Sequence, residues 1–216
     1  MIDSNNISKR IVDVIVSPDS VIGFIHGALS VPYDLGYLVW GTFDTDSRYH
    51  RETERIRVLA AIKNGIFNYH HIEESIIMVL REFERHVPKN RKNVVYGQMS
   101  FSIIGRISAN SLLTSKITAA VVERATFLVN MRNSLFIGNL LVIGGMMEHC
   151  IRTSERLLAD NPEIYHLLRP RDYDLLYFLF ESAVEPFADA LRVKRQQGSV
   201  EFEKILSMVE RKIDAG

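Results

Sequence analysis

The sequence predicts an all-α protein: a single helical bundle of about seven to nine helices around a charge-poor central hairpin. Apolar residues recur at helical spacing in nearly every segment, and no alternating Val/Ile/Thr-rich run is long enough for a sheet. The helix-breaking residues are sparse, with 6 Pro and 12 Gly in 216 residues. A chain of this length can bury one sizeable core, so we expect one domain over residues 1–216.

The amino-terminal half, residues 1–92, reads as amphipathic and charged. Residues 7–16 fit a helix or a short strand, and residues 18–43 are apolar and punctuated by glycines. Small residues there allow close helix packing, but Tyr33, Tyr37 and Trp40 also suit a lipid interface. The two helices expected next are charged and amphipathic, with Asn64–Gly65 between them as a stop signal; they cover Asp46 to Ile62 and Tyr69 to His86.

The carboxy-terminal part, residues 148–216, returns to ordinary soluble-helix chemistry. A charged helix from Glu148 ends at Asn161–Pro162, and a short segment follows up to Arg169–Pro170. The next helix, residues 172–195, contains Pro186, so we expect a kink or break near Glu185. A short amphipathic helix from Val200 to Ile213 ends the chain.

Residues 93–147 differ from both flanking parts in charge. They hold five charged residues among 55 positions, whereas the other 161 positions carry 47. The most apolar stretch, Ala125 to Met147, contains Arg132 as its only charge. The part without any charge, Asn133 to Met147, has 15 residues. A membrane-spanning helix needs about 20 apolar residues and a buried core helix about 10–14, so this stretch is intermediate. We expect it at the centre of the bundle, paired with the preceding helix as a hairpin joined near Glu123–Arg124.

Each helix of this predicted hairpin has one uncharged polar or small stripe. On a helical wheel the first stripe covers an arc of roughly 120° and the second roughly 140°. Hydroxyl, amide and glycine stripes let helices approach closely in a membrane, and around a pore they pass ions without trapping them. The residues expected to line such a pore, with Arg132 at one helix end, are Ser108, Ser111, Ser115, Thr118, Asn130, Arg132, Ser134, Gly138 and Gly144.

A soluble interpretation of the same pattern remains open. A helix that is apolar most of the way round is often the central helix of a soluble bundle. Its Ser and Thr hydroxyls then bond back to the helix backbone, and Gly144–Gly145 forms a packing notch. Arg106, Lys116 and Arg132 each cost roughly 2.5–3.5 kcal/mol at a bilayer centre, which argues against permanent membrane residence.

Overall charge and cysteine content exclude some classes of protein. Lys+Arg and Asp+Glu both number 26, so the balance gives no reason to expect nucleic-acid binding. Cys150 is alone, so no internal disulfide forms. The first sixteen residues include Asp3 and Asp13 and lack a signal-peptide pattern, so we expect a cytoplasmic location or export without a cleaved signal.

Few residue groups suggest catalytic or metal chemistry, and we expect neither a metal nor a cofactor. Asp44–Thr45–Asp46 is read as a helix cap rather than a metal motif. His70, His71 and Glu74 share one helix, where His70 and Glu74 are spaced to share a metal. Glu163 and His166 have the spacing used in di-iron bundles, but the sequence shows no partners for them on other helices. Cys150 and His149 are neighbours that point about 100° apart, so they form no dyad.

The combination of an apolar, glycine-punctuated start, a charged middle and a charge-poor Ser/Gly hairpin resembles small antibacterial effectors of type VI secretion. The group it resembles is the ion-selective, membrane-depolarising toxins. The stretches that carry the likeness are Val21 to Phe43 and Ile103 to Met147, about a third of the chain. The likeness is one of pattern, so no functional residue is carried over by position.

This resemblance implies a non-enzymatic toxin that inserts into the inner membrane of a target cell and causes ion leakage. The partners it implies are the target bilayer, a cognate immunity protein in the producer and a component of the secretion machinery, with homo-oligomers in the membrane. Two alternatives remain open. One is a soluble helical binding module, such as an immunity or adaptor protein, and the other is an enzyme with a dispersed site around His70, His71 and Glu74.

Overall fold

The computed structural model describes residues 3–17, 48–88, 113–123 and 138–214, and the description below covers only these. They are 91% helical, with eight α-helices and no strand. The predicted all-α class and the predicted number of helices are therefore confirmed. Residues 7–16, which fitted either a helix or a strand, belong to a helix.

The elements follow one another with short connections where both flanks are described. In chain order they are α1 (Ser4–Val16), α5 (Arg48–Lys63), α6 (Tyr69–His86), a helix over residues 113–123, α9 (Gly138–Asp160), α10 (Pro162–Leu168), the 3₁₀ turns η2 (Arg169–Arg171) and η3 (Tyr173–Leu176), α11 (Tyr177–Gln197) and α12 (Ser199–Asp214).

Polar caps and left-handed residues set several of the helix ends. The Asn68 side chain accepts a hydrogen bond from the backbone N–H of His71, 2.9 Å away, and so caps α6. Gly65 follows α5 with a φ of 75°, the left-handed conformation that glycine adopts without strain. Asp172, between η2 and η3, has a φ of 60°, which Asp tolerates better than most residues.

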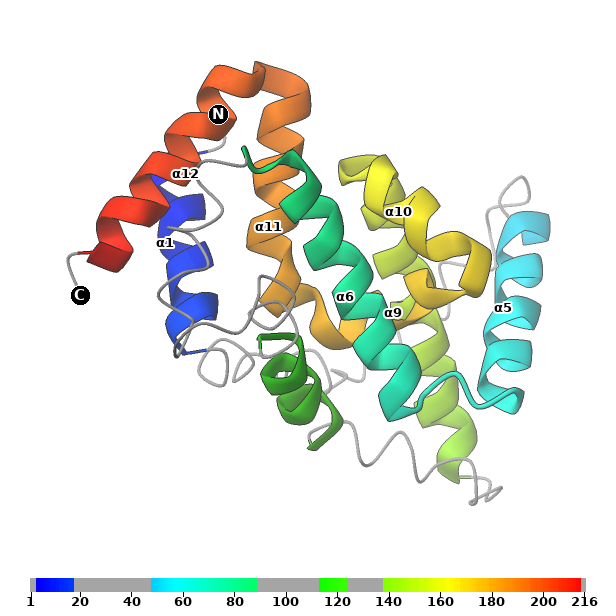
Figure 1. The fold of residues 1–216 in the computed structure, drawn as a ribbon. Helices are drawn as coiled ribbons and strands as arrows, with labels where there is room; N and C mark the ends of the chain where they lie inside the picture. Colours follow the sequence, from blue (N-terminus) through cyan, green and yellow to red (C-terminus); the bar gives the residue numbers. More distant parts are fainter. Residues whose placement is uncertain (1–2, 18–47, 89–112, 124–137, 215–216) are drawn as a thin grey trace.

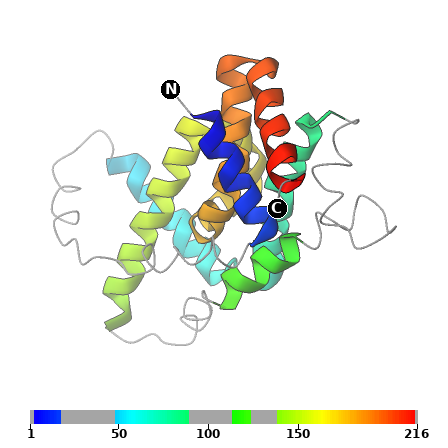
Figure 2. The ribbon, with the colours of Figure 1, turned by 90° about the vertical axis from the view of Figure 1, so that its left-hand side faces the viewer.

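Helix α11 occupies the middle of the described bundle and contributes the largest buried set, thirteen residues. α1 and α12 lie side by side against it on one flank, α6 crosses its front, and α9 and α10 lie on the other flank (Figures 1 and 2). α5 packs on α9 at the far edge (Figure 1). The bundle is thus a layer of helices wrapped around α11.

Aromatic side chains join three of these helices at the core. The ring of Phe83 in α6 meets Phe187 of α11 and Phe202 of α12 edge to face, with ring centroids 5.1 and 5.8 Å apart. All three are essentially inaccessible to solvent. Edge-to-face pairs add roughly 0.5–1.5 kcal/mol to the burial of each ring.

The structure bears on the expected central stretch and on the kink or break expected near Glu185. The described part of the expected central stretch, Gly138–Met147, begins α9, and residues 124–137 lie outside the described residues. Near Glu185 we expected a kink or a break; the break is wrong, because α11 continues as one helix through Pro186. Pro186 is buried within the helix, so its surroundings hold it in place despite the missing backbone donor.

Candidate functional site

The structure describes only some of the residues expected to line a pore. Ser115 and Thr118 lie in the helix over 113–123, and Gly138 and Gly144 lie in α9, where only the backbone is described. The others fall outside the described residues: Ser108, Ser111, Asn130, Arg132 and Ser134.

The helix over 113–123 has uncharged polar residues on both its buried face and its exposed face. Thr118 is fully buried and its hydroxyl donates to the backbone carbonyl of Thr114, 2.7 Å away. Ser115 is exposed. Leu113 and Ile117 are buried beside Thr118, so one face of this helix belongs to the bundle core. In this state Thr118 is bonded back to its helix, as the soluble interpretation expects.

The charged half of α9 is attached to the bundle by polar contacts. The Ser154 hydroxyl donates to the buried carboxylate of Asp174, 2.5 Å away. Arg156 pairs with Glu181 of α11 at 2.6 Å. Cys150, on the same half, is fully buried, and burial raises the pKa of its thiol, so it is not a reactive nucleophile.

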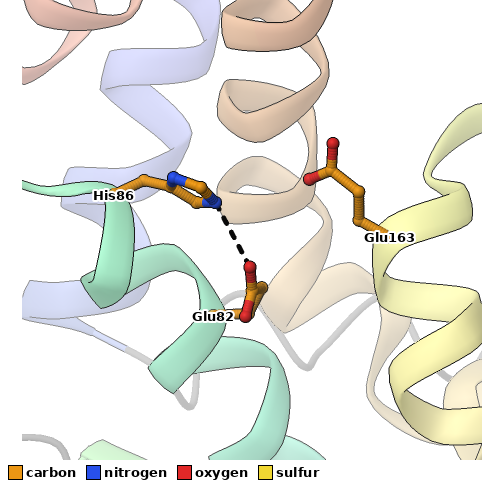
Figure 3. A group of neighbouring side chains, drawn as sticks. All are labelled: Glu82, His86 and Glu163. Atoms are coloured by element: carbon orange, nitrogen blue, oxygen red, sulfur yellow. Dashed lines mark hydrogen bonds and ion pairs between the residues drawn. The ribbon is translucent and has the colours of Figure 1, made fainter.

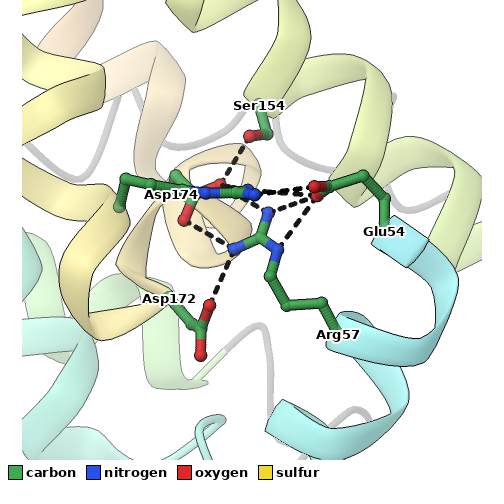
Figure 4. Close-up of polar contacts among 6 residues, drawn as sticks. Glu54, Arg57, Ser154, Asp172 and Asp174 are labelled. Atoms are coloured by element: carbon green, nitrogen blue, oxygen red, sulfur yellow. Dashed lines mark hydrogen bonds and ion pairs between the residues drawn. The ribbon is translucent and has the colours of Figure 1, made fainter. Parts of the chain in front are cut away.

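A group of six polar side chains, which we call the charge network, joins α5, α9, η2 and η3 (Figure 4). Arg57 of α5 lies at its centre and donates to Asp174 through both terminal nitrogens, at 2.9 and 2.7 Å. Arg57 also reaches Asp172 at 2.8 Å and Glu54 at 2.6 Å. The members are Glu54, Arg57, Ser154, Arg169, Asp172 and Asp174.

Arg169 completes the charge network from the opposite side. It donates to Glu54 at 2.7 Å and to Asp174 at 3.3 Å. Because Asp174 is fully buried and Glu54 is 5% exposed, both carboxylates depend on these two arginines for compensation. Every charged member has an opposite charge within hydrogen-bond distance.

The electrostatics of the charge network follow from these contacts. Burial raises the pKa of Glu54, but hydrogen bonds from Arg169 and Arg57 outweigh it and lower the pKa to about 2. For Arg57, burial lowers the pKa, yet the hydrogen bonds and charge of Asp174 raise it overall. Glu54 and Arg57 therefore keep their charges over the physiological range. Because every charged member of the network is paired, the arrangement fits a structural role.

The residues of the dispersed-enzyme hypothesis do come close together at the surface. Glu74 pairs with Arg171 and accepts a hydrogen bond from the Tyr173 hydroxyl at 2.7 Å. The His71 ring lies 5.6 Å from the Tyr173 ring, measured between centroids, and its Nδ1 contacts the Asn68 side chain. Burial and the bond to Glu74 raise the pKa of Tyr173 to about 12. Glu74 is thus bound to η2 and η3 rather than to His70.

A second polar group, the Glu–His–Glu cluster, consists of Glu82 and His86 of α6 and Glu163 of α10 (Figure 3). One potential ligand atom from each of the three lies within 4.8 Å of the others. Sequence reasoning singled out Glu163 but paired it with His166 on the same helix. The signal it missed is the spacing of Glu82 and His86, one turn apart on one face of α6.

An open cavity borders the Glu–His–Glu cluster. Its volume is about 480 Å³, and it lies between α6 and α10. Glu82 is part of its lining, together with Met78 and Leu167. A small solute or ion therefore reaches the Glu82 carboxylate from solvent.

Comparison with known proteins gives no family or fold neighbour: no protein-family model, no curated protein and no solved structure matches this chain. In the part of the chain that the structure describes, no helix has both the length and the apolar composition that crossing a membrane requires.

Proposed function

We propose that this protein is a membrane-active antibacterial toxin that inserts a charge-poor helical hairpin into the inner membrane of a target cell and causes ion leakage. The observation that supports it most is the division of α9. Its first ten residues, Gly138–Met147, carry no charged side chain, while its second half carries the polar contacts to the bundle.

The uncharged half of α9 continues the composition of the preceding residues. From Asn133 to Met147 the chain has no charged residue, and the polar residues it does have are Asn and Ser. An uncharged helix of this kind pays little desolvation cost in a bilayer, whereas each Arg or Lys costs roughly 2.5–3.5 kcal/mol at its centre. The composition therefore allows transfer from a protein interior to lipid.

The described bundle supplies a stable body for this hairpin. The charge network and most of the core around α11 lie outside the segment proposed to insert. That segment contributes five described residues to the core: Leu113, Ile117, Ala120, Val121 and Met146. Insertion then requires the described buried residues of this segment, Ile117 and Thr118 among them, to leave the bundle. It does not require the charge network to open.

This proposal places the protein in the cytoplasm of its producer, exports it without a cleaved signal and brings it to the inner membrane of the target. The partners are the target bilayer and a cognate immunity protein that protects the producer. A component of the secretion machinery carries it, and several copies assemble in the membrane. No nucleic acid, metal or cofactor takes part in the leak itself.

Leakage from liposomes tests the proposal. The purified wild-type chain should release a trapped ion-sensitive dye, and Gly144→Leu and Gly138→Leu should abolish release by filling the close-approach stripe. Ala159→Leu, at an exposed position on the charged half of the same helix, is the matched control and should leak like wild type. A folded wild-type chain that releases no dye contradicts the proposal. Unchanged release from both glycine variants shows that the stripe is not involved.

A soluble binding module, such as an immunity or adaptor protein, is the second candidate. The burial of Thr118, with its hydroxyl bonded to Thr114, favours it, because that arrangement needs no lipid. The two candidates separate in the same experiment. A module forms a stoichiometric complex with a protein partner and leaves liposomes intact.

A further inference from the structure

We propose that Glu82, His86 and Glu163 bind a divalent first-row transition-metal ion, with Zn²⁺ as the representative, at the junction of α6 and α10. This inference is independent of the membrane proposal, because no member of the Glu–His–Glu cluster belongs to the charge-poor hairpin. It also departs from the sequence analysis, which expected no metal.

Two of the three ligands are preorganised by one helix. Glu82 and His86 lie one turn apart on α6, and the His86 Nε2 atom is 3.2 Å from the Glu82 Oε1 atom. In a tetrahedral zinc site with bonds of about 2.1 Å, neighbouring ligand atoms are separated by about 3.4 Å. The Glu82–His86 pair therefore already has the separation that a shared ion requires.

The third ligand comes from the neighbouring helix. Glu163 lies in the first turn of α10, and its carboxylate points toward α6 (Figure 3). Its ligand oxygen lies within 4.8 Å of the ligand atoms of Glu82 and His86. Because the Glu163 side chain is 43% exposed, it has room to move closer to them when an ion binds. Glu82 is 12% and His86 24% exposed, which leaves the site partly shielded but open to solvent on one side.

The ligand set selects the class of ion. One imidazole and two carboxylates suit zinc and its first-row neighbours, whereas Mg²⁺ and Ca²⁺ prefer all-oxygen sites. Three protein ligands leave at least one coordination position for water, as in catalytic rather than structural zinc sites. Glu82 also lines the open cavity, so solvent lies next to one of the three ligands.

Three positively charged side chains contact the cluster, and they must move away when a metal ion binds. Arg85 contacts Glu82 at 3.1 Å, and Arg195 lies 4.0 Å from Glu163. Lys194 lies 2.5 Å from the Nδ1 atom of His86. Coordination through Nε2 leaves the proton on Nδ1, which needs an acceptor, and an ammonium group offers only donors. Lys194 therefore opposes metal binding and must turn away.

Lys194 therefore lowers the affinity of the cluster for a metal ion. Lys194→Gln removes one positive charge and offers a side-chain carbonyl to the Nδ1–H of His86. We expect this substitution to tighten binding about tenfold, in line with the effect of outer hydrogen-bond partners at metal sites. A structural role for Lys194 alone predicts no such gain.

Isothermal titration calorimetry of the full chain with Zn²⁺ tests the proposal. The wild-type chain should bind one Zn²⁺ ion at the cluster. His86→Ala and Glu163→Gln should each weaken the zinc affinity at least about tenfold. His166→Ala and His70→Ala are matched controls, because both histidines are exposed and lie outside the cluster. Mg²⁺ should give no comparable binding.

The outcomes are decisive in either direction. Glu163→Gln changes an exposed side chain, so it tests the site even if His86→Ala impairs folding. Zinc affinity that is unchanged in Glu163→Gln, or that falls as much in His166→Ala, overturns the proposal, as does the absence of any zinc binding by the folded chain. None of these results bears on liposome leakage, so the two proposals fail separately.

Discussion

The two halves of α9 differ in charge. Gly138–Met147 has no charged residue, whereas Glu148–Asp160 has five. The charged half is joined to other elements by Ser154, which contacts Asp174, and by Arg156, which contacts Glu181. One continuous helix thus combines a segment without charged residues and a segment whose side chains make polar contacts with η3 and α11.

This difference separates stability from the proposed activity. Changes to the contacts of the charged half should alter the free energy of unfolding, because those contacts belong to the bundle. Changes to the small residues of the uncharged half should alter leakage. The two predictions that follow act on the charge network, which the charged half of α9 joins through Ser154, in order of expected effect.

The largest effect is expected at Asp174, the buried carboxylate of the charge network. Asp174→Ala leaves Arg57 and Arg169 short of a partner and removes the acceptor of Ser154. Breaking a buried ion pair from one side costs about 3–5 kcal/mol, so urea unfolding should show a loss of that size in the free energy of unfolding.

The matched control is the exposed ion pair between Arg156, on the charged half of α9, and Glu181 of α11. Arg156 is 54% exposed, and pairs of this kind contribute about 0.2–1 kcal/mol. Arg156→Gln should therefore shift the unfolding midpoint only slightly. Equal shifts in Asp174→Ala and Arg156→Gln would show that the charge network does not stabilise the fold.

A smaller effect is expected from pH through Glu54. Its pKa is about 2 in the folded protein against an ordinary value of 4.5, so the folded state favours the ionised carboxylate. The resulting stability is complete above about pH 4.5 and is lost as the pH falls toward 2. The shift corresponds to at most about 3 kcal/mol.

Urea unfolding at several pH values, with Glu54→Gln beside wild type, isolates this contribution. The difference between the two proteins should be largest near neutrality and shrink below pH 4.5. Carboxylates outside the charge network have the same surroundings in both proteins, so their contributions cancel in the difference. A difference that stays constant with pH would mean that Glu54 is not stabilised as a carboxylate.

Sequence patterns predicted the bounds of the helices in the described bundle where local signals were strong. The predicted helix from Tyr69 to His86 has those bounds in the structure, and the Asn64–Gly65 stop follows α5. The final helix was expected over Val200 to Ile213 and extends one residue further at each end. Periodicity, caps and glycine act within a few residues, so a single sequence is enough to read them.

The long-range features escaped prediction because they join residues far apart in the chain. Arg57 and Asp174 are 117 positions apart, and nothing near either residue indicates the other. The central position of α11 depends on what packs on all its sides, which periodicity cannot give. The break expected at Pro186 failed because surrounding helices hold that proline in place, and tertiary packing outweighed a local rule.

The candidate sites show the same limit. The Glu–His–Glu cluster draws two ligands from α6 and one from α10, and only the fold brings Glu163 to Glu82 and His86. The spacing of Glu82 and His86 was visible in the sequence, but so were several other pairs of acidic residues and histidines. For the pore-lining residues, the pattern remains a prediction at Ser108, Ser111, Asn130, Arg132 and Ser134, which lie outside the described residues.

The membrane potential of bacteria that produce this protein is the most direct test of its proposed activity. A potential-sensitive dye should report depolarisation when the wild-type chain is directed to the periplasm, and none when the chain is retained in the cytoplasm. Gly144→Leu, directed to the periplasm at equal abundance, should leave the potential unchanged. A folded wild-type protein that reaches the periplasm without depolarising the cell would contradict the proposal.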